Sequence, residues 1–492
     1  MELLFDDKWI DRADGVRRVL GQPRKEAAPI LKADHAWETD GIQGLQSVYW
    51  DEEEGKFKLW YRARVRRDRP AGPSAEAGGE TSERDEAGWQ TFLCYAESQD
   101  GVTWTKPSLG LYAFDGNGDN NILRPVGNAS IVFSNIQKDP HDPDPARRYK
   151  ALGFEHAPET RLPVRGAQSH GVCVAYSPDG LRWPSGPKLV MSTTDLTDAD
   201  CLFPGRDPNT GQWVGFMRPR VHPKRRFVGY ATSADFEHWT YPRMLLTPDA
   251  RDSEWVEFYG LTAASVDGYA VGLLWVFRND PAYSPMTNEL VYSRDGRHYE
   301  RAMPGVQFLP LGEPGSFDSR MVTPFGLVVR QHELLIYYNG ANYDHGSDRG
   351  QPMPPGVVEP GQPRRQGIGL ARLPRGMLCG YQADAEGRLE TTYVTNFEGP
   401  GPRVLADVAP GGSIQAELLD HYGQVLPGWE RERCRAVRHE YGRVSFAWGE
   451  AGLTGQLDDV SSEGGRVQRV VKLRLFLRRA TVFGFAVGEG QR

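Results

Sequence analysis

Short runs of alternating apolar and polar residues dominate the chain and predict β-strands. Four of them read FLCYAE, GVCVAY, FVGYAT and NELVYS, and each ends at a turn. Because successive side chains of a strand point to opposite faces, this period of two is typical of a strand with one buried face. Patterns with the helical period are nearly absent. The sequence therefore predicts an all-β fold.

A short motif follows each of these runs. Its copies read SQDGVTW, SPDGLRW, SADFEHW and SRDGRHY, and they begin at Ser98, Ser177, Ser233 and Ser293. The Asp-Gly pair suits a tight turn, since glycine adopts a positive φ and aspartate can bond its own backbone. The aromatic residue at the end can fold over the next strand. A repeat of about 60 residues predicts stacked supersecondary units.

Each copy is preceded by a second alternating run that opens at a turn, for example WDEEEGKFKLWY or VDGYAVGLLWVF. A fifth unit, VRQHELLIYYNG followed by GIGLARLPR, has the strands without the motif. A shorter segment upstream of each unit can form an innermost strand. We therefore expect a five-bladed β-propeller over residues 1–375. A propeller can reach this size because each blade buries its faces only against its neighbours.

The character of the sequence changes in residues 376–492. Strand patterns such as SIQAELLD and VVKLRLFLRR continue there, but no further copy of the motif occurs. A stretch of this length and pattern predicts a β-sandwich, which we interpret as an accessory domain after the propeller.

Composition narrows the function. The net charge of -7 offers no general basic face, so a nucleic-acid partner is not expected. The five cysteines are scattered without a CxxC pair, which predicts neither a zinc site nor a disulfide framework. The start, MELLFDDKWIDRADG, lacks the basic and apolar regions of a signal peptide, and no stretch has the length of a membrane span. We expect a cytoplasmic protein with no cofactor and no membrane partner, and we leave its oligomeric state open.

Acidic residues stand just before the predicted innermost strands of four blades. They are Glu38 and Asp40 in blade one, Asp198 and Asp200 in blade three, Glu254 and Glu257 in blade four, and Asp318 in blade five; blade two has Asn128 instead. The starts of radially repeated strands fall on a common ring, so one acid from each of these blades should reach one mouth of the channel. The four that we expect to meet there are Asp40, Asp200, Glu257 and Asp318.

Glycoside cleavage needs such a set of acids. One protonated carboxyl serves the leaving oxygen, and one ionised carboxylate serves water or the anomeric carbon. A third acid nearby can raise the pKa of the proton donor by like-charge repulsion. The alternative for each acid is a turn-capping role.

Several other residues near the predicted strand starts are candidates for substrate binding. Trp37 and Tyr259 suit stacking on a sugar ring, although strand aromatics more often belong to the core. Arg218 and Arg320 can orient hydroxyls or bind phosphate, or they can pair with the carboxylates. His345, next to Asp344, can reach the mouth and bond sugar hydroxyls. The DPHDPDP stretch from Asp139 is interpreted as a stiff turn rather than a cation site, so we expect no metal.

Together, the SxDGxxW repeats, the acids on innermost strands and the trailing β-domain resemble the five-bladed glycoside hydrolases of families 32, 43, 68 and 130. The segments GSFDSRMVTP and LLIYYNGANYDHG are similar to the last blade of uncharacterised family-32-like proteins. The resemblance implies a nucleophile or base on blade one, which falls on Asp40, and a glutamate as general acid, for which Glu257 is the best candidate. Asp200 then modulates the pKa of the acid or stabilises the transition state, and Asp318 accepts a substrate hydroxyl.

The chain departs from family 32 in two motifs. The Asn-Asp-Pro-Asn and Glu-Cys-Pro motifs of that family are absent. Arg206-Asp207-Pro208 is similar to its Arg-Asp-Pro motif but occupies the position of a hairpin, so we interpret Asp207 as a turn residue.

Three functions remain open at this point. The first is hydrolysis of a furanoside or another small glycoside. The second is a phosphorylase similar to family 130, where phosphate replaces water, and Arg218 with Arg220 would supply the cationic pocket. The third is a carbohydrate-binding propeller without catalysis. In all three the partner is a small carbohydrate, whose identity and linkage the sequence leaves open.

Overall fold

The computed structural model describes most of the chain. The described residues are 1–66, 89–126, 135–156, 170–184, 187–192, 201–207, 209–218, 220–221, 225–346, 363–395, 401–449 and 470–487. Over these ranges the regular elements are β-strands and short 3-10 helices, which confirms the all-β prediction. None of the helices in these ranges is long and apolar enough to span a membrane.

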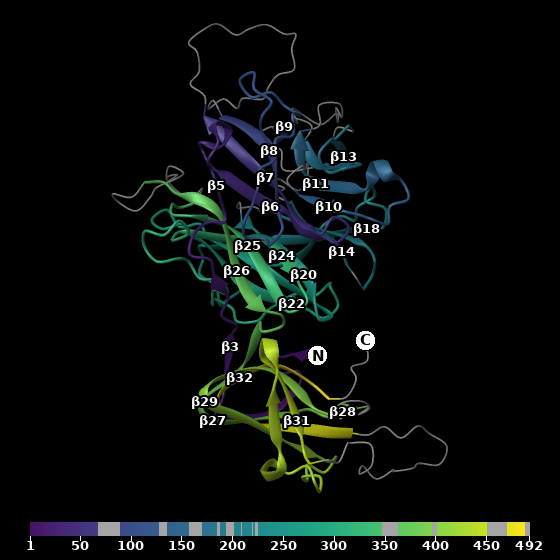
Figure 1. The fold of residues 1–492 in the computed structure, drawn as a ribbon, viewed down its shortest axis with the longest axis vertical. Helices are drawn as coiled ribbons and strands as arrows, with labels where there is room; N and C mark the ends of the chain where they lie inside the picture. Colours follow the sequence, from purple (N-terminus) through teal and green to yellow (C-terminus); the bar gives the residue numbers. More distant parts are fainter. Residues whose placement is uncertain are drawn as a thin grey trace.

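In the described ranges, five antiparallel units follow one another in the upper part of Figure 1, the first four with four strands each. A single parallel pair, Met286 with Met321, joins the fourth and fifth units into one sheet. The first three are β6 (Ile42–Asp51), β7 (Lys56–Arg66), β8 (Trp89–Ser98) and β9 (Ile122–Val126); β10 (Ile136–Lys138), β11 (Tyr149–His156), β12 (His170–Ser177) and β13 (Lys188–Ser192); β14 (Cys201–Arg206), β15 (Trp213–Met217), β18 (Val228–Ser233) and β19 (Arg243–Leu246). The fourth is β20 (Val256–Val266), β21 (Tyr269–Arg278), β22 (Met286–Ser293) and β23 (Glu300–Arg301). We interpret each unit as one blade of a propeller.

The fifth unit is completed by the N-terminal part of the chain. It contains β24 (Met321–Val329), β25 (Glu333–Ala341) and β26 (Gln366–Pro374), and the short strands β4 (Arg24–Lys25) and β5 (Leu31–Lys32) pair with β26. Blade five then meets blade one, where the Asn339 side chain bonds both the N–H and the C=O of Gly44, at 2.8 and 2.9 Å. A Cβ at Gly44 would lie 2.2 Å from the Phe325 ring, so only glycine allows this approach. These contacts close the ring of blades.

The repeated motif forms the turn after the third strand of blades one to four. In the first copy, the Ser98 hydroxyl accepts a hydrogen bond from the Gly101 N–H at 2.9 Å, and Asp100 accepts from Val102 and Thr103. In the third copy, Phe236 takes the place of the glycine with φ at +70° and is fully buried. The tryptophans of the first three copies are more than half buried, as predicted: Trp104, Trp183 and Trp239.

A second sheet of nine antiparallel strands lies below the blades in Figure 1. We call it the C-terminal sheet. Its C-terminal strands are β27 (Cys379–Thr391), β28 (Val394–Thr395), β29 (Arg403–Leu419), β30 (Arg435–Arg438), β31 (Arg443–Ala447) and β32 (Val470–Ala486), and its N-terminal strands are β1 (Glu2–Leu3), β2 (Ile10–Asp14) and β3 (Arg17–Leu20). The sheet has its own apolar core, which includes Leu4, Tyr381, Ile414 and Leu475.

The first three strands therefore pair differently from the prediction, which placed residues 1–375 in the propeller. They pair with β27 and β32, because their partner is fixed by packing in three dimensions and not by closeness in sequence. The β-sandwich expected for residues 376–492 stays a prediction.

Candidate functional site

The innermost strands β6, β10, β14, β20 and β24 lie against one another around the centre of the blades. Since all five units have the same strand order, the first residues of these strands face the same side of the molecule. We call this region the channel mouth. It includes Asp40, Glu257, Tyr259, Arg320 and His345, and it is the region for which the sequence predicts an active site.

Glu257 is the second residue of β20 and is fully buried. Arg226 donates from Nη1 to its Oε2 over 2.6 Å, and the Asn279 amide donates to its Oε1 over 3.1 Å. Arg226 belongs to the short strand β17 (Arg225–Arg226), and its side chain is also buried. Two buried charges tolerate burial only when they are paired and hydrogen-bonded in this way. The negative charge of Glu257 is therefore balanced inside the protein.

Tyr259 and His345 join blade four to the end of blade five. The His345 Nε2 and the Tyr259 hydroxyl are 2.8 Å apart. The Arg218 guanidinium lies 4.0 Å above the Tyr259 ring centre, and Arg218 itself is buried. One face of this ring is thus covered by a cation. A sugar predicted to stack on Tyr259 could therefore use only the part of the ring that Arg218 leaves uncovered. The Tyr259 hydroxyl is paired with His345.

Arg320 is held by an acid that follows β25. It donates from Nε and Nη2 to the two carboxylate oxygens of Asp344, over 2.8 and 2.7 Å. The guanidinium also lies 4.3 Å above the ring of Tyr283. Of the two roles expected for Arg320, these contacts match pairing with a carboxylate of the mouth.

Asp40 lies between the 3-10 helix η1 (Ala36–Glu38) and strand β6, and it is half-buried. Burial raises the pKa of the Asp40 carboxyl above its usual range, and the nearby guanidinium groups of Arg364, Arg64 and Arg66 act in the opposite direction. The Arg364 guanidinium lies 3.9 Å above the ring of Tyr343, two residues before His345. Asp40 therefore lies near the segment after β25 that also carries His345.

Asp318 has structural partners. Its carboxylate is buried and accepts hydrogen bonds from Lys25 at 2.6 Å, Tyr338 at 3.0 Å and Ser316 at 2.8 Å. Lys25 comes from β4, the N-terminal strand that completes blade five. Asp318 thus fixes this strand. The expected role of Asp318 as acceptor for a substrate hydroxyl stays a prediction.

Trp37 and Glu38 also have structural partners. The indole of Trp37 stacks on His35 at 4.5 Å and donates to the Asn121 side chain at 3.2 Å. Glu38 is fully buried and accepts from Tyr61 at 2.6 Å and Lys106 at 2.7 Å. Both residues fasten η1 onto blade one. The predicted stacking of a sugar on Trp37 is replaced by packing.

Two turn interpretations agree with the structure. Asp207 accepts from the Asn209 N–H at 2.9 Å and from the Thr210 hydroxyl at 3.0 Å, which is the pattern of a turn. In the DPHDPDP stretch, the Lys150 ammonium lies 3.0 Å from Asp139 and 2.5 Å from Asp142. Over the described ranges, no group of three or more His, Cys, Asp or Glu is arranged to hold a metal ion.

Some predicted residues lie outside the described part, and some residues of the site were missed. Asp200, Asp198 and Asn128 belong to segments that the structure does not describe. Arg226 and Arg364 were not predicted, because each sits in a basic run, HPKRR or QPRRQ, whose members look alike in sequence. Their position in the sequence could have indicated them, because Arg226 comes shortly before β20 and Arg364 shortly before β26.

No family model matches the chain, and no curated protein matches it. It is similar to solved structures at low identity. An N-acetylgalactosamine deacetylase from F. plautii in complex with blood group B trisaccharide is 13% identical, with 73% of this chain and 96% of that chain covered and a TM-score of 0.40. A β-1,2-mannobiose phosphorylase from Listeria innocua is also 13% identical, with 72% of this chain and 96% of that chain covered and a TM-score of 0.43.

A glycoside hydrolase family 32 β-fructofuranosidase from Bombyx mori is 10% identical to the chain. The aligned part covers 94% of this chain and 93% of that chain, with a TM-score of 0.39. Glycoside hydrolases are thus among the solved structures to which the chain is similar. Substrate and catalytic residues have to be inferred from the side chains of this chain.

Proposed function

We propose that the protein is a carbohydrate-active enzyme that cleaves glycosidic bonds at the channel mouth. The observation that carries this proposal is the contrast between two carboxyl groups. Glu257 is buried against Arg226 and Asn279, whereas burial raises the pKa of Asp40. Acid–base cleavage of a glycoside uses two carboxyl groups in different surroundings, one to give a proton and one to act as base or nucleophile.

The contacts support roles opposite to those expected from the sequence. A raised pKa favours the protonated form, so Asp40 suits the general acid, which gives its proton to the leaving oxygen as the C–O bond breaks. Glu257, with its charge balanced by Arg226, suits the base or nucleophile. It then takes a proton from the attacking water or attacks the anomeric carbon itself.

The neighbouring polar groups fit substrate positioning. The Tyr259 hydroxyl and His345 can donate to or accept from sugar hydroxyls beside Glu257. Arg218 covers Tyr259, and Arg320 is fixed on Asp344, so each holds its neighbour in place. A rigid surrounding of this kind keeps the carboxyl groups at a constant orientation toward the substrate.

Phosphorolysis is the second candidate. The guanidinium groups of Arg218, Arg226 and Arg364 lie at the mouth with a single acid whose pKa is raised. Arginine forks match phosphate oxygens well, so inorganic phosphate could take the place of the attacking water. In that reaction the product is a sugar phosphate.

A panel of aryl glycosides, assayed with and without inorganic phosphate, tests the proposal. Hydrolysis releases the aryl alcohol and a free sugar in either buffer. Phosphorolysis releases the alcohol only with phosphate and yields a sugar phosphate, which mass spectrometry distinguishes. If no glycoside is cleaved while sugars still bind the protein, the carbohydrate-binding alternative replaces the enzyme.

A further inference from the structure

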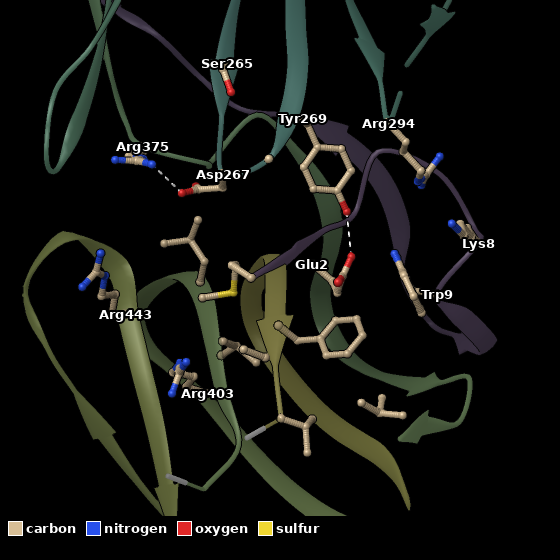
Figure 2. Close-up of a pocket in the computed structure, with 18 of the residues that line it drawn as sticks. Glu2, Lys8, Trp9, Ser265, Asp267, Tyr269, Arg294, Arg375, Arg403 and Arg443 are labelled. Atoms are coloured by element: carbon tan, nitrogen blue, oxygen red, sulfur yellow. Dashed lines mark hydrogen bonds and ion pairs between the residues drawn. The ribbon is translucent and has the colours of Figure 1, made fainter. Parts of the chain in front are cut away.

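A cavity lies between the β20–β21 hairpin of blade four and the C-terminal sheet, and none of the residues named at the channel mouth lines it. Figure 2 shows Asp267 and Tyr269 on the blade side and Arg403 and Arg443 on the sheet side. Its volume of about 1260 Å³ exceeds the roughly 300–1,000 Å³ of most small-molecule sites. The cavity has room for a ligand of several sugar rings.

The walls of this cavity are cationic, in contrast to the net charge of -7 of the chain. Its basic residues are Lys8, Arg294, Arg375, Arg403 and Arg443, against the two carboxylates of Glu2 and Asp267. Arg375 pairs with Asp267 at 2.8 Å, and Arg294 binds Asp6 at 2.7 Å. Within the described residues, the other three basic side chains form no ion pair. The cavity therefore has a surplus of positive charge.

Two of these cations are placed next to each other. Arg403 begins β29 and Arg443 begins β31, and the two strands pair with Leu405 opposite Arg443. Residues two apart on a strand share a face, so Arg403 and Arg443 lie on the same face of the sheet. Like charges at such diagonal positions repel each other. An anion held between them would remove this repulsion.

The remaining lining offers an aromatic surface. Trp9, which lies beside Lys8 in Figure 2, adds a flat apolar surface of the kind on which sugar rings stack.

We propose that this cavity binds an anionic oligosaccharide, through its carboxylate or sulfate groups, at a site distinct from the channel mouth. The preference for an anion follows from the cavity's own charges. The choice of a saccharide rests on the proposed function. Arg403 and Arg443 bind the anionic groups, and Trp9 contacts a sugar ring.

Calorimetry on the full chain tests the site, in the Asp40→Asn background so that turnover does not consume the ligand. The probes are trigalacturonate, its methyl ester and a heparin tetrasaccharide, which separate carboxylate, neutral and sulfate ligands. We expect at least one anionic probe to bind, and the methyl ester to bind about tenfold more weakly or worse. Added salt should weaken the binding of the anionic probe.

The decisive protein is the double variant Arg403→Gln, Arg443→Gln, which should bind the anionic probe about tenfold more weakly or worse. Arg435→Gln is the matched control, since Arg435 is exposed on β30 of the same sheet and outside the cavity; it should leave binding unchanged. The proposal is overturned if no anionic probe binds, if the ester binds equally well, or if the pair has no effect. Loss of turnover in Asp40→Asn is measured separately, so failure of the proposed function remains distinguishable.

Discussion

Arg226 and Glu257 form a buried ion pair at the mouth of the propeller, with 2.6 Å between Nη1 and Oε2. The two residues come from different segments, the short strand β17 and the start of β20. The pair orients the carboxylate and balances its charge. The proposed base or nucleophile is therefore fixed before any substrate arrives.

Replacing this carboxylate should remove activity. Glu257→Gln keeps the size of the side chain and removes the charge, so we expect kcat to fall by about 10²–10⁴-fold. The loss of the counter-ion of Arg226 should also lower the free energy of unfolding, by about 3–5 kcal/mol. Steady-state kinetics and chemical denaturation measure the two effects.

Glu289→Gln is the control for this variant. Glu289 is a buried carboxylate on β22 that pairs with Arg301 at 2.7 Å, away from the mouth. Its replacement should lower stability to a similar degree and leave the kcat of the folded protein within a few-fold. If both variants lose kcat equally, the loss reflects damage to the fold and not catalysis.

Asp40 should show the behaviour of a general acid. A general acid matters most when the leaving group is poor, because a good leaving group departs without a proton. Asp40→Asn should therefore lose far more kcat on an alkyl glycoside than on a dinitrophenyl glycoside. Equal losses on both substrates would instead favour the role of base, which the sequence predicts.

The raised pKa of Asp40 also predicts a pH dependence. Its carboxyl binds a proton more tightly in the folded state than at its usual value of 3.8. The associated stability is present below that value and is lost as the pH rises through the folded-state pKa. The free energy of unfolding of the wild type, relative to Asp40→Asn, should fall as the pH rises above 3.8. A difference that rises with pH would contradict the desolvation of Asp40.

The repeat was predictable because its cause is local. Ser98, Asp100 and Gly101 bond one another within four residues, so the motif specifies its own turn wherever it occurs. Strand order then follows from the spacing of these turns. The innermost strands β6 and β20 were predicted from the same pattern, whereas the meeting of Asp40 and Glu257 at one mouth stays a prediction.

Long-range pairing was not predictable from the same patterns. Asp318 looks like the acids of the other blades, but Lys25, which is distant in the sequence, covers its carboxylate. Residues 1–375 were assigned to the propeller as one block, but strands β1–β3 pair with β27 and β32. The contact of Arg226 with Glu257 depends in the same way on how separate segments fold together.

The bond between Asp318 and Lys25 gives a further prediction. Asp318→Asn weakens the bond to Lys25, so the free energy of unfolding should fall by about 1–3 kcal/mol. Turnover of the folded protein should stay within a few-fold of the wild type. A large loss of kcat without a change in stability would support the role in substrate binding that the sequence suggests.

Asp207 should behave as a turn residue. Asp207→Asn keeps one acceptor oxygen for the Asn209 N–H, so the free energy of unfolding should fall by no more than about 1 kcal/mol. Its kcat should remain within a few-fold. A drop of several orders of magnitude in a folded variant would mean that Asp207 acts like the aspartate of the Arg-Asp-Pro motif.

Cleavage by the two carboxyl groups of the mouth is the central claim. Its most direct test is aryl alcohol release from a panel of glycosides, with and without phosphate, by the wild type and by the Asp40→Asn, Glu257→Gln double variant. We predict that the wild type cleaves at least one member and that the folded double variant does not. Equal release by both proteins, or no release by the wild type from any member, would contradict the claim.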